Sequence, residues 1–249
     1  MLKEERLNTI VSLVDKSGTV KVQEIMDRLQ VSDMTVRRDL TELEKQGKLK
    51  RVHGGAQSIN IYRHEELSHE QKKIIHQDEK KQLAELTLPL IEQDDTIFLG
   101  PGTTIELLAA SLPDFPLRVV TNSLPVFSIL EPRENIMLYL IGGELRRKTG
   151  AFYGEMANTV LQDIRFGKAF IGANALSENR VMTATIEEGR TQEIALNNSF
   201  EKYLLLDGSK IGKEDFYSFY HVSDLTALIT NTAENGELNA FEDLVRIIK

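Results

Sequence analysis

The chain has no cysteine and no tryptophan, and only 6 % of its 249 residues are aromatic. Without cysteine there is no disulfide framework, no thiol nucleophile and no Cys-based zinc site. Long apolar runs are also missing, because no stretch approaches the roughly 18 residues that predict a membrane span. The N-terminal sequence MLKEERLNTIVSL lacks the apolar core and cleavage site of a signal peptide, so we expect a cytoplasmic protein without membrane partners.

Histidines are few and irregularly spaced. We expect His64, His69 and His76 to be exposed linker residues rather than metal ligands, and we expect neither a metal nor a cofactor. Hydrophobic residues make up 41 % of the sequence, which is enough for a sizeable core in one or two domains.

Charge is distributed unevenly along the chain. The net charge is −8, but residues 1–57 carry 11 Lys and Arg against 9 Asp and Glu, whereas the remainder carries 19 against 29. Phosphate contacts supply most of the non-specific affinity for DNA, and they scale with the number of cations that touch it. Because the basic segment is small and the rest of the chain is acidic, we expect one copy of the protein to bind DNA weakly. Two or more DNA-binding domains should therefore bind one operator together.

The run VSDMTVRRDLTELEKQGKLKRVHGGA, residues 31–56, predicts a DNA-recognition helix followed by a basic hairpin. Ser32 is a good N-cap, and Val36, Leu40 and Leu43 recur at helical spacing on one apolar face. The opposite face turns cations, hydroxyls and a methyl-bearing side chain outward, groups that reach phosphates and base edges. The candidate DNA-binding residues on and beside this helix are Ser32, Met34, Thr35, Arg37, Arg38, Thr41 and Lys45.

A lone basic amphipathic helix is more often an ordinary solvated helix, but its neighbours favour DNA binding. Two helices are expected upstream, over residues 6–14 and 22–29, with Gly18 ending the first, which completes a helix-turn-helix unit. Downstream, Gly47 is a plausible residue just past the helix end, and residues 49–53 alternate before the Gly54–Gly55 turn. This hairpin predicts a wing whose Lys50, Arg51 and His53 contact the DNA backbone.

The rest of the chain predicts an α/β domain. Residues 58–76 lack a clean period and are interpreted as a linker between a DNA-binding domain, residues 1–57, and a second domain, residues 77–249. In the second domain short apolar strands, such as residues 96–99 and 117–120, alternate with helices, such as residues 79–91 and 104–112. That alternation is typical of a largely parallel, Rossmann-like sheet.

Five of the expected strands end in small or polar residues. In an open parallel sheet these ends share one edge, where ligands bind. The clearest is residues 100–104, because Gly100 and Gly102 let the backbone approach an anion and Thr103 and Thr104 open a helix. A dinucleotide is a weaker interpretation, since Ile105 replaces the third glycine of the usual fingerprint. Lys210 suits a phosphate and Asp207 suits sugar hydroxyls.

The run at residues 31–56 resembles the N-terminal signature of the DeoR family of bacterial repressors. The likeness extends through DTIFLGPGTT, VVTNS, LIGGELRR and LLDGSK. Within the family, FLGPGTTIELLA, VMTATIEEGRTQ and EKYLLLDGSKIGKEDF are most similar to members that control lactose and tagatose 6-phosphate metabolism in Gram-positive bacteria. The resemblance implies a winged helix-turn-helix domain and a sensor domain similar in fold to ribose 5-phosphate isomerase-type enzymes.

The resemblance also implies the partners and the effector contacts. We expect operator DNA, a sugar-phosphate effector such as tagatose 6-phosphate, and a homo-oligomer, either a dimer or a tetramer. The effector-binding residues implied in this way are Gly102, Thr103, Thr104, Thr121, Asn122, Ser123, Gly142, Gly143, Asp207 and Lys210, with Lys80 and Lys72 as basic residues at the start of the sensor domain.

Two alternatives remain open at this stage. The same type of repressor could sense another metabolite, such as fructose 1-phosphate or glycerol phosphate. The chain could instead be a sugar-phosphate isomerase or hydrolase with a DNA-binding head, in which Asp207 or Glu144 serves as the base. No further acid–base group accompanies these carboxylates in the sequence pattern, so we expect no catalytic residues.

Overall fold

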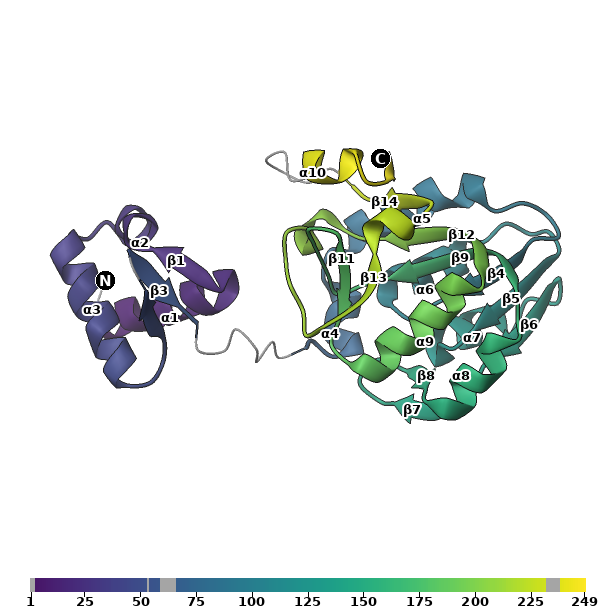
Figure 1. Cartoon of the computed structure of the whole chain (residues 1–249), viewed down its shortest axis with the longest axis horizontal. Coiled ribbons are helices and arrows are strands. Elements are labelled where there is room, and N and C mark those ends of the chain that lie inside the picture. The colour runs from purple at the N-terminus through teal and green to yellow at the C-terminus, as the bar shows by residue number, and fades with distance from the viewer. Residues whose placement is uncertain (1–2, 53, 59–65, 232–237) are drawn as a thin grey trace. The chain divides into compact units, whose positions relative to one another are not determined.

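A computed structural model describes residues 3–52, 54–58, 66–231 and 238–249. The chain divides into two compact units, Met1–Glu65 and Glu66–Lys249 (Figure 1). No helix of the described residues is both long enough and apolar enough to cross a membrane.

The first unit combines three helices with a three-stranded antiparallel sheet. The helices are α1 (Lys3–Ser17), α2 (Val22–Leu29) and α3 (Asp33–Lys45). The strands are β1 (Thr19–Lys21), β2 (Lys50–Val52) and β3 (Gly55–Gln57), in the order β1-β3-β2. The predicted helix-turn-helix and wing are thus confirmed. The pairing of β1 with β3 was not predicted, because three residues are too few to show a period.

Helix α3 begins and ends as its sequence predicts. The Ser32 side chain accepts a hydrogen bond from the Thr35 backbone N–H, which caps the helix N-terminus. At the other end Gly47 adopts φ +67°, donating to the Glu44 carbonyl, while the Lys48 N–H reaches the Leu43 carbonyl. This pair of bonds is a Schellman ending, and it turns the chain directly into the wing.

The core of the first unit is made by the apolar stripes of its three helices. Val36, Leu40 and Leu43 of α3 are buried together with Ile10 of α1 and Ile25 of α2. The spacing that predicted the helices therefore also predicted which of their faces pack together.

The second unit is built on a seven-stranded parallel sheet in the order β15-β14-β12-β9-β4-β5-β6. Its strands are β4 (Thr96–Leu99), β5 (Leu117–Thr121), β6 (Ile136–Leu140), β9 (Phe166–Gly172), β12 (Ser199–Leu205), β14 (Ala227–Ile229) and β15 (Arg246–Ile248). The predicted α/β class is confirmed.

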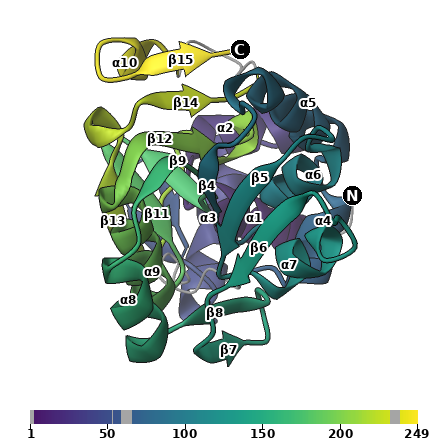
Figure 2. The same ribbon diagram turned by 90° about the vertical axis from the view of Figure 1, so that its right-hand side faces the viewer.

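Helices cover both faces of this sheet (Figure 2). On one face lie α5 (Gln77–Thr87), α6 (Thr103–Ser111) and α7 (Leu124–Leu130), whose buried residues share a cluster with Ile97 and Val119. On the other lie α8 (Glu155–Gln162) and α9 (Ile186–Asn197), which share a cluster with Phe98 and Val120. Alternate residues of one strand thus enter opposite cores, as a sheet buried on both faces requires.

Smaller elements complete the second unit. Strands β7 (Glu144–Arg146) and β8 (Ala151–Tyr153) form a hairpin, and β10 (Ala175–Ser177), β11 (Arg180–Thr183) and β13 (Tyr217–His221) form a small antiparallel sheet. The remaining helices are α4 (His69–Ile74), α10 (Asn239–Glu242), η1 (Leu88–Leu90), η2 (Gly208–Lys210) and η3 (Val222–Asp224).

The strand order creates one topological switch point. From β4 the chain proceeds to β5 and β6 on one side, and from β9 to β12, β14 and β15 on the other. Because β4 and β9 are neighbours whose connections diverge, a crevice is expected at their carboxyl ends, outside residues 100–104 and 172–174.

The predicted linker extends too far into the second unit. Residues 66–76 contain helix α4, which Ser68 opens with a capping box, and they belong to the second unit. His69 is half-buried rather than exposed, because its ring contacts the buried carboxylate of Glu106. His76 is exposed as expected, and His64 lies outside the described residues.

Candidate functional site

The outward face of α3 carries at its centre a cation that has no partner among the described residues. Arg38 is exposed, and it makes no hydrogen bond or ion pair with any residue that the structure describes. Met34, one turn earlier, is 81 % exposed, and Lys45 at the helix end is exposed as well. A free guanidinium on a rigid helix has the bidentate geometry that reads a guanine in the major groove.

Arg37, the neighbouring cation, is held along the helix surface. Its Nε donates to both carboxylate oxygens of Asp33, at 3.0 and 2.7 Å. The hydroxyls of Ser32 and Thr35 lie 3.0 Å apart at the start of the same helix. These residues therefore belong to one polar surface around the N-terminus of α3, where phosphate oxygens are favoured by free N–H groups and the helix dipole.

The wing contributes two further described cations. Lys50 is exposed and without a partner in the described part of the chain. Arg51 instead donates from Nη1 to the Thr41 hydroxyl at 2.8 Å, and its backbone N–H bonds to Glu44 at 2.8 Å. The third wing residue predicted to bind DNA, His53, lies outside the described residues.

A half-buried ion pair joins α1 to the inner side of α3. Arg6 of α1 donates to Asp39 of α3, with Nε 2.6 Å from Oδ2 and Nη2 3.3 Å from Oδ1. Asp39 is fully buried. Sequence reasoning missed this pair, because the two residues are 33 positions apart and each alone is typical of a helix surface.

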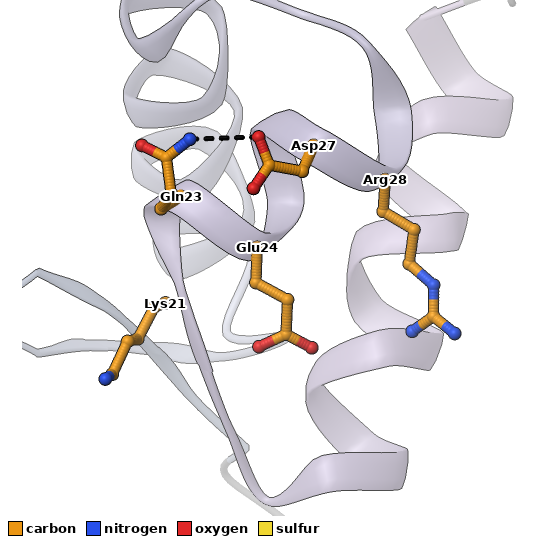
Figure 3. Close-up of a pocket in the computed structure, with 5 residues that line it drawn as sticks. All are labelled: Lys21, Gln23, Glu24, Asp27 and Arg28. Atoms are coloured by element: carbon orange, nitrogen blue, oxygen red, sulfur yellow. Dashed lines mark hydrogen bonds between the residues drawn. The ribbon is translucent and has the colours of Figure 1, made fainter.

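A surface pocket of the first unit lies beside α2 and is lined by Lys21, Gln23, Glu24, Asp27 and Arg28 (Figure 3). Gln23 donates to Asp27 across it at 2.9 Å. Two carboxylates and two cations line the pocket together, so it lacks the single sign of charge that would select an anion. None of the residues predicted to bind DNA or effector belongs to it.

In the second unit, two glycines in the loops after the strands allow the chain to pack closely against neighbouring residues. A Cβ on Gly143 would lie 2.5 Å from the Tyr153 carbonyl oxygen, and one on Gly100 would lie 3.1 Å from Ile171. Gly102, at φ +128°, is the N-cap of α6, while a Cβ on Gly142 would meet no atom within 4 Å. Gly102 leaves space at the α6 N-terminus, beside buried Thr103 and Thr104, because a Cβ there would meet no atom within 4 Å.

Two of the three predicted residues at the end of β5, Thr121 and Ser123, make hydrogen bonds that support the fold. The Thr121 hydroxyl donates to the Leu99 carbonyl at 2.7 Å, and the Ser123 hydroxyl caps α7 through the Val126 N–H. Asn122 differs from both. Its Nδ2 donates to the Phe152 carbonyl at 2.8 Å, but its buried Oδ1 has no hydrogen-bond partner in the structure described.

Asp207 and Lys210 follow β12 and form an ion pair, with Nζ 3.4 Å from Oδ2. Burial raises the pKa of Asp207, but the charge of Lys210 and the hydrogen bond from Ser209 outweigh it, so the pKa is lowered. The buried Oδ2 still lacks a hydrogen bond among the described residues, because the geometry of this contact is poor. Burial lowers the pKa of Lys210, whereas Asp207 acts against that shift.

Lys80 and Lys72 lie close to this pair. Lys80 is buried, with Nζ donating to the carbonyls of Ile75, at 2.7 Å, and Lys72. Burial and the charge of Lys210 lower its pKa. The Lys72 ammonium donates to Asn174, at the end of β9, at 3.1 Å. The structure thus brings lysines from three segments together at the edge predicted to bind a phosphate.

Sequence reasoning missed a charged network beside these lysines. Arg146 contacts the carboxylates of Glu66 and Glu188, and Glu66 also contacts Lys72. Burial raises the pKa of Glu188, although the Thr149 hydroxyl and Arg146 act in the opposite direction. The motif LIGGELRR contains Arg146, but nothing in that motif indicates which carboxylates it meets.

A winged helix-turn-helix unit with a free cation on its recognition helix, joined to a parallel α/β unit with open polar strand ends, defines a DNA-binding transcriptional regulator. Comparison with known families agrees with this class. The DeoR-like helix-turn-helix domain matches residues 6–61, and the DeoR C terminal sensor domain matches residues 75–232. The chain therefore belongs to the DeoR family.

The family assignment is supported over the whole chain. It is 50 % identical to the lactose phosphotransferase system repressor of Streptococcus mutans serotype c and 46 % identical to that of Staphylococcus aureus, with 100 % of each chain covered. Among solved structures, ribose 5-phosphate isomerase A from Methanocaldococcus jannaschii is similar at 20 % identity and a TM-score of 0.40, covering 54 % of each chain. A likeness this distant carries no argument about activity.

Proposed function

We propose that this protein represses an operon of the lactose phosphotransferase system. Its first unit binds operator DNA, and a sugar phosphate, tagatose 6-phosphate, releases it from the operator. Full-length identity of 50 % to a repressor of that name supports the assignment. The relatives are named as repressors rather than enzymes, which favours ligand sensing over turnover at the strand ends.

The observation that carries the effector assignment is a pair of buried oxygens that lack a hydrogen bond among the described residues, although Asp207 Oδ2 keeps its ion pair with Lys210. Asn122 Oδ1 and Asp207 Oδ2 lack hydrogen-bond partners within the described residues, and each follows a strand of the parallel sheet. A buried acceptor without a donor costs about 1–3 kcal/mol, so such groups commonly await a ligand. Sugar hydroxyls supply the donors, while Lys210 and the α6 N-terminus supply positive charge for a phosphate.

The release mechanism is a linkage between two binding equilibria. If the effector prefers a state of the protein that binds operator weakly, its differential affinity shifts the population off the DNA. The small basic footprint of one head favours a homo-oligomer, a dimer or a tetramer, acting in the cytoplasm on a palindromic or repeated site.

The test measures both ligands on purified full-length protein. Fluorescence anisotropy with labelled operator duplex should show tight binding that tagatose 6-phosphate abolishes. Thermal-shift measurements against tagatose 6-phosphate, fructose 1-phosphate and glycerol phosphate should show the largest stabilisation with the first, because a ligand that binds the native state raises its stability by mass action. Larger stabilisation by another compound would reassign the effector, and conversion of the sugar phosphate to an isomer would indicate an enzyme.

A further inference from the structure

Glu66, the first residue of the second unit, lies against two cations of the sensor unit. Its carboxylate forms a fork with Arg146, with distances of 3.1 and 2.5 Å, and accepts from Lys72 Nζ at 3.1 Å. The side chains of Glu66, Arg146 and Lys72 are 8, 18 and 27 % exposed. Burial raises the pKa of Glu66, but Arg146 and Lys72 outweigh it, so the pKa is lowered.

Lys72 belongs to the proposed effector site, and Arg146 lies beside it. Lys72 also donates to Asn174 at the switch point, and its charge acts on the pKa of both Lys80 and Lys210. Arg146 ends β7, the strand that directly follows Gly142 and Gly143. An anion that binds at this edge of the sheet therefore meets cations that already contact the carboxylate of Glu66.

Arg146 keeps a second partner if Glu66 leaves. Its Nη1 lies 3.1 Å from Glu188 of α9, whose side chain is only 5 % exposed and also accepts from Thr149. Glu188 is thus fixed inside the unit, whereas Glu66 sits where the chain enters it. Of the two carboxylates, Glu66 has the fewer side-chain partners among the described residues, Arg146 and Lys72, whereas Glu188 accepts from Arg146, Thr149 and Thr185.

Polar contacts, rather than apolar burial, hold the segment that follows Glu66. Helix α4 has no buried residue, and Ile74 is 74 % exposed. The segment is fastened by the His69 N–H to the Lys148 carbonyl at 3.0 Å, by the His69 ring to Glu106, and by Lys80 to the Ile75 carbonyl. Loss of one ion pair therefore weakens a larger share of its attachment than it would in a segment with an apolar core.

We propose that Glu66 and the phosphate of the effector compete for Lys72 and Arg146, so that effector binding releases Glu66 and loosens residues 66–69, while Lys72 stays with the phosphate. This rests on the proposed function, in which a sugar phosphate binds at this edge. Because Glu66 directly follows the residues that join the two units, the competition changes the point at which the chain is anchored to the sensor unit. Effector binding in this way alters the attachment of the chain that leads to the DNA-binding unit.

The test uses Glu66→Gln in the full-length protein, with Glu70→Gln as a matched control. Both variants remove one negative charge close to α4, but Glu70 is 87 % exposed and contacts only the adjacent His69, at 3.6 Å, among the described residues. Thermal-shift titrations with inorganic phosphate and with tagatose 6-phosphate should give half-maximal concentrations at least about fivefold lower for Glu66→Gln, the lower end of usual coupling between sites. The control should match the wild type.

Hydrogen exchange provides the second readout. The His69 amide should exchange faster in Glu66→Gln without ligand, and faster in the wild type when tagatose 6-phosphate is added. Greater protection of that amide on ligand binding, or an unchanged phosphate affinity of Glu66→Gln, would overturn the competition. If no sugar phosphate binds the wild type, the proposed effector is wrong, while the phosphate titrations still judge the competition. If Glu66→Gln fails to fold, Glu66→Asp replaces it, and its shorter reach should give a smaller change in the same direction.

Discussion

The Arg51 guanidinium in the wing donates a hydrogen bond of 2.8 Å to the Thr41 hydroxyl of the recognition helix. Thr41 in turn donates to the Arg37 carbonyl one turn earlier, also at 2.8 Å. Sequence reasoning assigned the two residues separate roles on DNA, one in the groove and one on the backbone. Their contact fixes the wing against the helix before DNA arrives, so both parts of the interface are preorganised.

Thr41→Val should loosen the wing. Valine keeps the branched shape but removes the hydroxyl, so Arg51 loses its partner at a cost of about 1 kcal/mol, which is roughly fivefold in operator affinity. A double-mutant cycle with Arg51→Ala, measured by anisotropy at fixed salt, should show that the two losses are not additive. Additive losses would mean that each residue acts on DNA independently.

Arg38→Ala should weaken operator binding by about 1–3 kcal/mol and flatten the preference between bases at one position. Arg38 has no described partner to lose, so the fold should be retained. The control is Arg118→Ala, an exposed arginine on β5 of the sensor unit, which should leave operator affinity unchanged. Equal operator affinity of Arg38→Ala and wild type would remove this residue from the interface.

Lys50→Ala should lower the affinity for every DNA sequence to the same extent. A lysine that contacts only phosphate supplies charge without base information, so its loss should reduce the salt-dependence slope by about one unit. Anisotropy titrations between low and moderate salt, with operator and with scrambled duplex, measure this directly. Lys81→Ala, an exposed lysine on α5, is the matched control. A loss confined to the operator would assign Lys50 to base reading.

Lys210→Ala should give a protein that still represses but responds poorly to effector. Removing a charge-assisted contact should reduce effector affinity by about 1.5–3 kcal/mol, or more than tenfold. Lys213→Ala, three residues along and exposed, should respond normally. Gel-shift titrations with and without tagatose 6-phosphate distinguish a role of Lys210 in effector binding from a structural role. Wild-type release by Lys210→Ala would exclude the residue from the site, and lost DNA binding without sugar would indicate a structural role.

Asp39→Asn should destabilise the first unit. Asp39 is buried and Arg6 half-buried, so removing the carboxylate should cost about 1–3 kcal/mol, because Arg6 loses its charged acceptor. Glu42→Gln breaks the exposed Lys3–Glu42 pair on the same helix and should cost less than about 1 kcal/mol. Thermal denaturation followed by circular dichroism compares the two. Similar melting temperatures for both variants would contradict the importance of the Arg6–Asp39 pair.

Local signals explain why so much of the fold was predictable. Ser32, the apolar spacing of α3 and Gly47 each act within a few residues, and the structure realises all three as a cap, a buried face and a helix ending. The strand-end loops were predictable for the same reason, because a parallel sheet places the carboxyl ends of its strands at one edge.

The parts that were missed depend on contacts between distant residues. Glu66 and Arg146 are 80 positions apart, and α4 has no apolar face that would indicate where it packs. The sequence therefore gave no signal that residues 66–76 belong to the sensor unit. The buried oxygens of Asn122 and Asp207 that lack a hydrogen bond among the described residues were also beyond prediction, because hydrogen bonding is a property of the assembled site rather than of either residue.

Each hydrophobic cluster of the described residues draws on one unit alone: residues 7–56 in the first, and residues 83–245 in the second. Substitutions that repack one core are therefore not constrained by the other. Through duplication and divergence of such genes, the DNA-binding unit and the sensor unit are able to change their ligands separately. The architecture favours the expansion of a regulator into many regulons by separate, small mutational steps.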